Sequence, residues 1–157
     1  MLLKDKRLTF SILDENTPIP YELLLQSPLS NKLIDGGAIS PGILVARQDD
    51  EIVGVIELSP MNEEEMEIKN VLVKPTFNGQ GIDTYLIKNA IRLARREKYH
   101  RIYIGTSNSN IAHLYFYQKL GFEICEIKKG FITQQYPEPF FENGIQAKDM
   151  VMLMKEL

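Results

Sequence analysis

The stretch from residue 71 to residue 96 constrains the fold more than any other part of this sequence. A short apolar run ends before Pro75, a loop carries Gly79 and Gly81, and a helical repeat follows. The apolar positions of that repeat share one face of a helix and are Leu86, Ile87, Ala90, Ile91, Leu93 and Ala94. An apolar strand pattern over residues 101–106 comes next. A strand, a helix and a strand of these lengths predict a parallel crossover unit.

The remaining apolar patterns predict further strands around this unit. They cover residues 8–12, 42–48, 51–58, 66–73, 123–128 and 149–154. Asp49 and Asp50 predict a tight hairpin turn, and helices are expected over residues 21–26, 30–35 and 111–120. We therefore expect residues 1–157 to form a single α/β domain. Its sheet is predicted to be mixed and mostly antiparallel, with a central parallel β-α-β crossover flanked by helices.

Charge and cysteine content narrow the class of protein. The net charge of −3 argues against a nucleic-acid binder, and no apolar run approaches the ~20 residues of a membrane span. Cys125 is the only cysteine, so a reducing, cytoplasmic location is expected, with this thiol buried in a strand. His100 and His113 lack metal-ligand spacing, so no metal is predicted, and His113 is expected to pack inside its helix.

The loop between Pro75 and the helix predicts an anion site. Glycines let backbone amides approach a ligand closely, and a helix start adds unpaired N–H groups with partial positive charge. We expect the amides between Phe77 and Thr84 to be bare and to suit a diphosphate.

Two motifs resemble those of the GNAT superfamily of acetyl-CoA-dependent N-acetyltransferases. The first is residues 78–83 after a strand ending in Val73-Lys74-Pro75, with Gly81 at the family's central glycine. The second is Asn110 with Tyr117-Gln118-Lys119-Leu120-Gly121-Phe122. The resemblance implies a GNAT-like fold and direct transfer of an acetyl group from acetyl-CoA to an amine. Asn78 and Asp83 depart from the family's pattern, and a carboxylate at Asp83 would repel a diphosphate unless it points outward.

The resemblance also implies roles for individual residues. Glu67 is the candidate base, acting directly or through water, and Glu57 is the second candidate. Tyr117 is the candidate acid because a phenol stays protonated at neutral pH. The N–H groups of Leu72 and Val73 would polarise the thioester carbonyl. The residues expected to bind acetyl-CoA are Val71, Leu72, Val73, Asn78, Gly79, Gln80, Gly81, Ile82, Asp83, Thr84, Asn110 and Tyr117.

The acyl acceptor is the least constrained part of this interpretation. The aromatic, proline-containing stretch over residues 131–144 is expected either to wall the acceptor site or to form a homodimer contact. Acidic side chains at Glu63, Glu64, Glu65, Glu138 and Glu142 mildly favour a cationic amine. The alternative to an enzyme is a non-catalytic acyl-CoA-binding module or sensor.

Overall fold

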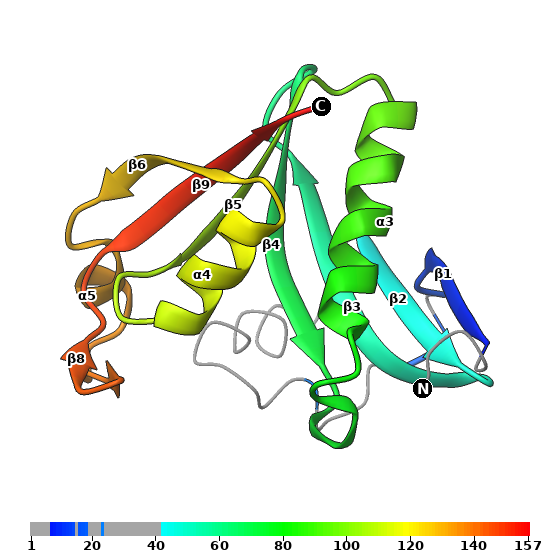
Figure 1. Cartoon of the computed structure of the whole chain (residues 1–157), viewed down its shortest axis with the longest axis horizontal. Coiled ribbons are helices and arrows are strands. Elements are labelled where there is room, and N and C mark those ends of the chain that lie inside the picture. The colour runs from blue at the N-terminus through cyan, green and yellow to red at the C-terminus, as the bar shows by residue number, and fades with distance from the viewer. Residues whose placement is uncertain (1–6, 15, 19–22, 24–41) are drawn as a thin grey trace. The chain divides into compact units, whose positions relative to one another are not determined.

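The computed structural model describes residues 7–14, 16–18, 23 and 42–157, and the chain divides into two compact units. The first unit comprises Met1–Pro60 and Ile68–Lys98, and the second comprises Met61–Glu67 and Tyr99–Leu157. Strand β4 (Glu65–Val73) therefore begins in the second unit and ends in the first (Figure 1). Of the two helices expected near the N-terminus, residues 30–35 and most of residues 21–26 lie outside the described residues; Leu23 is helical and buried.

The first unit is built on an antiparallel meander. Strands β1 (Leu8–Ile12), β2 (Ile43–Gln48) and β3 (Glu51–Pro60) pair in sequence order. The predicted hairpin turn is confirmed, because Asp49 and Asp50 join β2 to β3 with φ values of 50° and 77°. Aspartate tolerates this left-handed conformation, and two such residues match the twist of the flanking strands.

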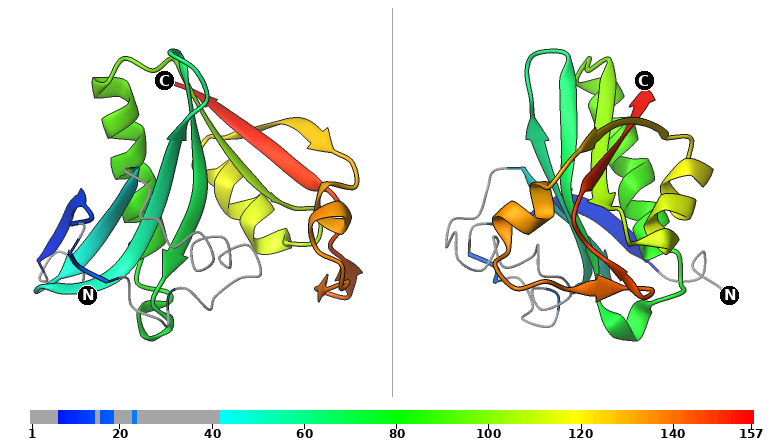
Figure 2. Two further views of the ribbon diagram at one scale, coloured as in Figure 1. Left: turned by 180° about the vertical axis from the view of Figure 1, so that it is seen from behind. Right: turned by 90° about the vertical axis from the view of Figure 1, so that its left-hand side faces the viewer.

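Helix α3 (Ile82–Arg96) covers one face of β2 and β3 in this unit (Figures 1 and 2). Its buried residues are Ile82, Leu86, Ile87, Ala90, Ile91 and Ala94. Five of the six residues of the predicted face are therefore buried, and the sixth, Leu93, is half-buried. A second buried cluster of the unit contains Leu13, Leu23, Ile43, Val45, Ile52, Val55 and Leu72. Each fully buried Leu or Ile contributes roughly 1.5–3 kcal/mol, so these two clusters fix where α3 begins.

The second unit is organised around β9 (Met150–Glu156). This strand pairs antiparallel with β5 (Arg101–Ser107) on one side and with β6 (Glu123–Lys128) on the other. Helix α4 (Ile111–Lys119) follows β5, and Asn110 caps its start, because Asn110 Oδ1 accepts a hydrogen bond from the His113 amide at 3.1 Å. Together, the strands of the chain form the predicted mixed, mostly antiparallel sheet with a parallel pair, flanked by helices.

Two expectations for the second unit are wrong, those for Cys125 and His113, and one segment holds regular structure that the sequence did not indicate. The segment between β6 and β9 holds a short helix, α5 (Phe131–Gln135), and a hairpin of β7 (Phe141–Glu142) and β8 (Ile145–Gln146). Cys125 is exposed, because β6 pairs on one side only and bulges at this residue. His113 is exposed on α4 rather than packed in the core. Within the described part of the chain, no helix is long and apolar enough to cross a bilayer.

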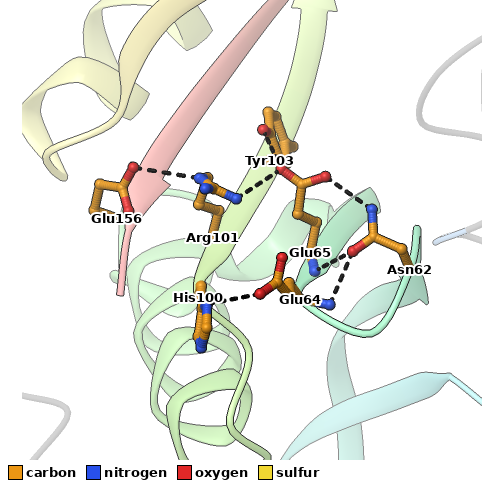
Figure 3. Close-up of polar contacts among 7 residues, drawn as sticks. All are labelled: Asn62, Glu64, Glu65, His100, Arg101, Tyr103 and Glu156. Atoms are coloured by element: carbon orange, nitrogen blue, oxygen red, sulfur yellow. Dashed lines mark hydrogen bonds and ion pairs between the residues drawn. The ribbon is translucent and has the colours of Figure 1, made fainter.

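A polar network joins the beginning of β4 to β5 and β9 in the second unit (Figure 3). Glu65 accepts hydrogen bonds from the Tyr103 hydroxyl at 2.7 Å, Asn62 Nδ2 at 2.8 Å and Arg101 at 3.1 Å. Arg101 also pairs with Glu156 at 3.4 Å. Glu65, which the sequence suggested only as one of several acidic side chains favouring a cationic amine, is therefore part of a structural network.

This network makes stability depend on pH through Glu65. The hydrogen bond from Tyr103, then that from Asn62, lowers the pKa of Glu65 below 4.5, so its contribution is present above pH 4.5 and lost as pH falls through the folded value. The hydrogen bond to Glu65, with burial, raises the pKa of Tyr103 to about 12.

We expect Tyr103→Phe to flatten the acid limb of the stability curve, because the pKa of Glu65 then returns toward its ordinary value. Thermal midpoints of both proteins between about pH 3 and pH 7 measure this effect. The control is Tyr115→Phe, since Tyr115 is 64% exposed and lies on α4. Parallel curves for the wild type and Tyr103→Phe would contradict the prediction.

Candidate functional site

The glycine turn, residues 78–84, connects β4 to α3 in the first unit. Strand β4 ends at Val73, and Pro75–Phe77 form one turn of 3-10 helix. Gly79 and Gly81 then adopt φ values of 78° and 80°, which side-chain-bearing residues rarely adopt. The chain thus reverses tightly and enters α3 at Ile82.

Half of the predicted bare amides are open. The amides of Phe77, Asn78 and Gln80 donate to Lys74, Pro75 and Phe77 carbonyl oxygens, because the proline starts a tight turn. Among the described residues, no protein group accepts a hydrogen bond from the open amides, which are those of Gly79, Gly81, Ile82 and Asp83. Four neighbouring donors at the positive end of a helix dipole form a concentrated anion-binding surface.

Asp83 lies within this surface and does not simply point away. Its Oδ1 accepts a hydrogen bond from the Thr84 amide at 2.8 Å, and the residue is half-buried. The Asp83 carboxylate therefore accepts a hydrogen bond from the Thr84 amide, which had been predicted to be open to a ligand. Negative charge at this position also stabilises the first turn of α3.

Gly54 on β3 sets how closely the glycine turn approaches the sheet. A Cβ atom at this position would lie 2.8 Å from Ile82 Cγ2, 2.9 Å from Leu86 Cδ1 and 3.2 Å from the Leu72 carbonyl oxygen. Because Gly54 has no side chain, the first residues of α3 can pack directly against β3. Gly54 was not among the residues predicted from the sequence, although a glycine inside a strand often marks a close approach.

The remaining predicted site residues are divided between the units. Val71, Leu72 and Val73 lie in the first unit with the glycine turn, and Leu72 is buried. Glu57 also lies there and accepts a hydrogen bond from Asn70 Nδ2 at 2.9 Å. Glu67 is a half-buried residue of β4 in the second unit.

Tyr117 and Asn110 belong to the second unit, on and before α4. Tyr117 is 5% exposed, and its ring centroid lies 5.2 Å from that of His113 and 6.3 Å from that of Phe122. His113 Nδ1 lies 2.9 Å from Asn110 Nδ2 and 3.3 Å from Thr106 Oγ1. The end of β5 and the start of α4 thus form a compact polar cluster next to a buried phenol.

A second polar cluster in this unit was missed from the sequence. Glu142 on β7 accepts hydrogen bonds from Ser107 Oγ at 2.5 Å and from Ser109 Oγ at 2.8 Å. Glu142 was considered only as part of a general acidic character, and neither serine was considered. More than 30 residues of chain separate Glu142 from each serine, so no local sequence pattern predicts the contact.

Comparison with known proteins places this geometry in a family. Residues 9–122 match the model of the acetyltransferase (GNAT) family. The N-acetyltransferase YvbK of Bacillus subtilis strain 168 is 35% identical, covering 97% of this chain and 98% of the relative.

Two solved structures share the fold and are described as ligand complexes. A GNAT family acetyltransferase from Elizabethkingia anophelis, with acetyl-CoA bound, is 41% identical with a TM-score of 0.87, covering 96% of this chain and 98% of its own. A Bacillus subtilis acetyltransferase in complex with CoA is 34% identical with a TM-score of 0.84, covering 96% of this chain and 99% of its own.

Proposed function

The chain belongs to the GNAT family of acetyltransferases, and we propose that it transfers an acetyl group from acetyl-CoA to a primary amine of a small molecule or peptide. The observation that carries the proposal is the set of open amides in the glycine turn, at Gly79, Gly81, Ile82 and Asp83. Such donors suit the diphosphate of acetyl-CoA. The relatives described with acetyl-CoA or CoA support this choice of donor.

In the proposed reaction the amine attacks the thioester directly. An alkyl ammonium has a pKa of about 10.4, so it must first lose a proton. Glu67 receives that proton through a water molecule, with Glu57 as the second candidate. The nitrogen then bonds to the acetyl carbon while the N–H groups of Leu72 and Val73 stabilise the charge on the carbonyl oxygen. The carbon–sulfur bond breaks, the sulfur keeps its electron pair, and Tyr117 donates a proton to the thiolate. The nitrogen loses its second proton as the amide forms, and this proton returns through water to the Tyr117 phenolate.

Other acetyl-CoA contacts follow from the family's pattern. We assign Val71, Asn78, Gln80 and Thr84 to the donor through their backbone or side chains, and Asn110 to its amide groups. Residues 1–157 would then act as one cytoplasmic domain, a proposal supported by a family match that spans residues of both units.

Asp83 is expected to weaken donor binding. We expect Asp83→Gly to tighten acetyl-CoA binding by about 1 kcal/mol, or about fivefold, because a negative charge near the diphosphate is removed. Stability should fall by about 0.3–1 kcal/mol, since α3 loses a favourable charge at its first turn. Calorimetric titration and thermal unfolding measure the two effects.

Asp83→Asn is the matched control, because it keeps a side-chain oxygen for the Thr84 amide and removes only the charge. A gain in affinity for both variants assigns the effect to charge. Equal affinities for the wild type and Asp83→Gly would mean that the carboxylate does not oppose the diphosphate.

A non-catalytic acyl-CoA sensor is the second candidate, and the Asp83–Thr84 hydrogen bond favours it by reducing the open surface. The discriminating experiment incubates the protein with acetyl-CoA and a panel of amines and follows free thiol. Thiol release that depends on an amine supports the enzyme. Tight donor binding with no release for any amine would favour the sensor.

A further inference from the structure

Glu142 presents a carboxylate that is fixed in place but not neutralised. Both serine hydroxyls donate to the same oxygen, Oε1, and these serines are 6% and 0% exposed. Neither Lys nor Arg among the described residues pairs with Glu142, and its Oε2 has no hydrogen-bond donor there. Hydroxyl donors orient a carboxylate while leaving its charge available to a partner.

The hairpin that carries Glu142 is itself anchored. Asn143 Nδ2 donates to the Ser109 carbonyl oxygen at 2.9 Å, and Asn108 Nδ2 donates to the Gln146 carbonyl oxygen at 3.1 Å. The turn and the second strand of the hairpin are thereby held against residues 108 and 109, between β5 and α4 (Figures 1 and 2). The carboxylate therefore has a defined position.

The place of this carboxylate in the chain connects it to the predicted chemistry. Residues 107–109 lead directly into Asn110 and α4, which carries Tyr117. Glu142 is half-buried and has no counter-ion among the residues that the structure describes, so it gains a strong charge-assisted hydrogen bond when a cation binds it. The reacting amine must be neutral to attack, so a group that stabilises positive charge suits a different nitrogen of the same molecule.

We propose that Glu142 binds a second, non-reacting ammonium group of the acyl acceptor, so that the preferred acceptors are diamines or related dications. This inference rests on the proposed acetyl transfer and names the class of acceptor. Ser107 and Ser109 are positioning residues that aim Oε2 at the cation. The alternative is that Glu142 only fastens the hairpin to the end of β5.

Glu142→Gln separates these two roles. The glutamine carbonyl oxygen still accepts from both serines, so the fastening survives while the charge is lost. The probes are cadaverine and pentylamine, which share chain length and differ by one ammonium group. We expect wild type to prefer cadaverine in kcat/KM, and Glu142→Gln to reduce that preference about 10- to 100-fold, mainly through KM.

Glu123→Gln is the matched control, because Glu123 is an exposed acid of β6 in the same unit. It should leave the preference unchanged. Ser107→Ala combined with Ser109→Ala should lower the preference for cadaverine although the charge of Glu142 remains, because the two hydroxyls no longer hold the carboxylate in its orientation. Thermal midpoints and the Kd for acetyl-CoA confirm that each variant is folded and binds the donor.

The outcomes distinguish this inference from the proposed function. Two results would reject the cation site but leave the proposed acetyl transfer intact. In the first, wild type acetylates amines but does not prefer cadaverine over pentylamine. In the second, Glu142→Gln keeps the wild-type preference. If no amine is acetylated, calorimetry of cadaverine with the CoA-bound protein decides. Binding that is lost in Glu142→Gln supports the cation site, whereas absent or unchanged binding overturns it.

Discussion

Tyr117→Phe is expected to lower kcat about 100-fold while leaving the fold nearly unchanged. The substitution removes only the hydroxyl that we assign to protonation of the departing thiolate, a step for which general acids contribute about 10²–10⁴-fold. The phenyl ring keeps the contacts that the Tyr117 ring makes with His113, Phe116 and Phe122. Steady-state thiol release with a saturating amine measures the effect.

Tyr115→Phe controls for removing a phenol from the same helix. Tyr115 is 64% exposed. Lys119 Nζ lies over its ring, 5.4 Å from the ring centroid, and a phenyl ring at this position can keep that contact. Turnover should be unaffected in this control. If Tyr117→Phe also turns over at the wild-type rate, Tyr117 is a packing residue and the thiolate leaves without its help.

Gly54→Ala is expected to destabilise the protein by about 2 kcal/mol and to weaken acetyl-CoA binding. The added methyl group overlaps the stiff side-chain methyl of Ile82 and crowds the Leu72 carbonyl oxygen. Relief requires α3 to lift from β3, which moves the open amides that precede and begin this helix. Chemical unfolding and calorimetric titration with acetyl-CoA measure the two losses.

Gly105→Ala is the matched comparison, because it makes the same change in a strand of the second unit. A Cβ atom there would lie 2.9 Å from Met152 Sδ and 3.0 Å from Met150 Sδ. Methionine side chains are flexible and can move aside, so a smaller loss of stability is expected. Equal losses of stability at both glycines, or unchanged acetyl-CoA binding in Gly54→Ala, would contradict the proposed role of Gly54 in the close packing of α3 on β3.

The sequence predicted the regular elements well because their periodicity reflects burial. The buried face of α3 lies where the helical repeat places it, and β6 has the predicted bounds. The hairpin at β7 and β8 was missed although Asn143-Gly144 is a strong hairpin pattern; both residues adopt positive φ, at 56° and 74°. The proline-rich context obscured a turn that local chemistry alone could have identified.

The candidate site was predictable only where its geometry is local. The glycine turn is contiguous in sequence, so its open amides could be anticipated from two glycines and a helix start. Contacts between residues far apart in the chain could not be anticipated. Glu142 on β7 reaches Ser107 at the end of β5 across 35 residues of chain, and Glu65 on β4 reaches Tyr103 on β5 across 38.

The division of the chain into two units has an evolutionary consequence. The glycine turn and Gly54 belong to the first unit, whereas the β7–β8 hairpin belongs entirely to the second. Substitutions in that short hairpin can alter which molecules are selected without disturbing any described contact of the turn. Related proteins could therefore diverge in acceptor specificity while they keep the same acyl donor.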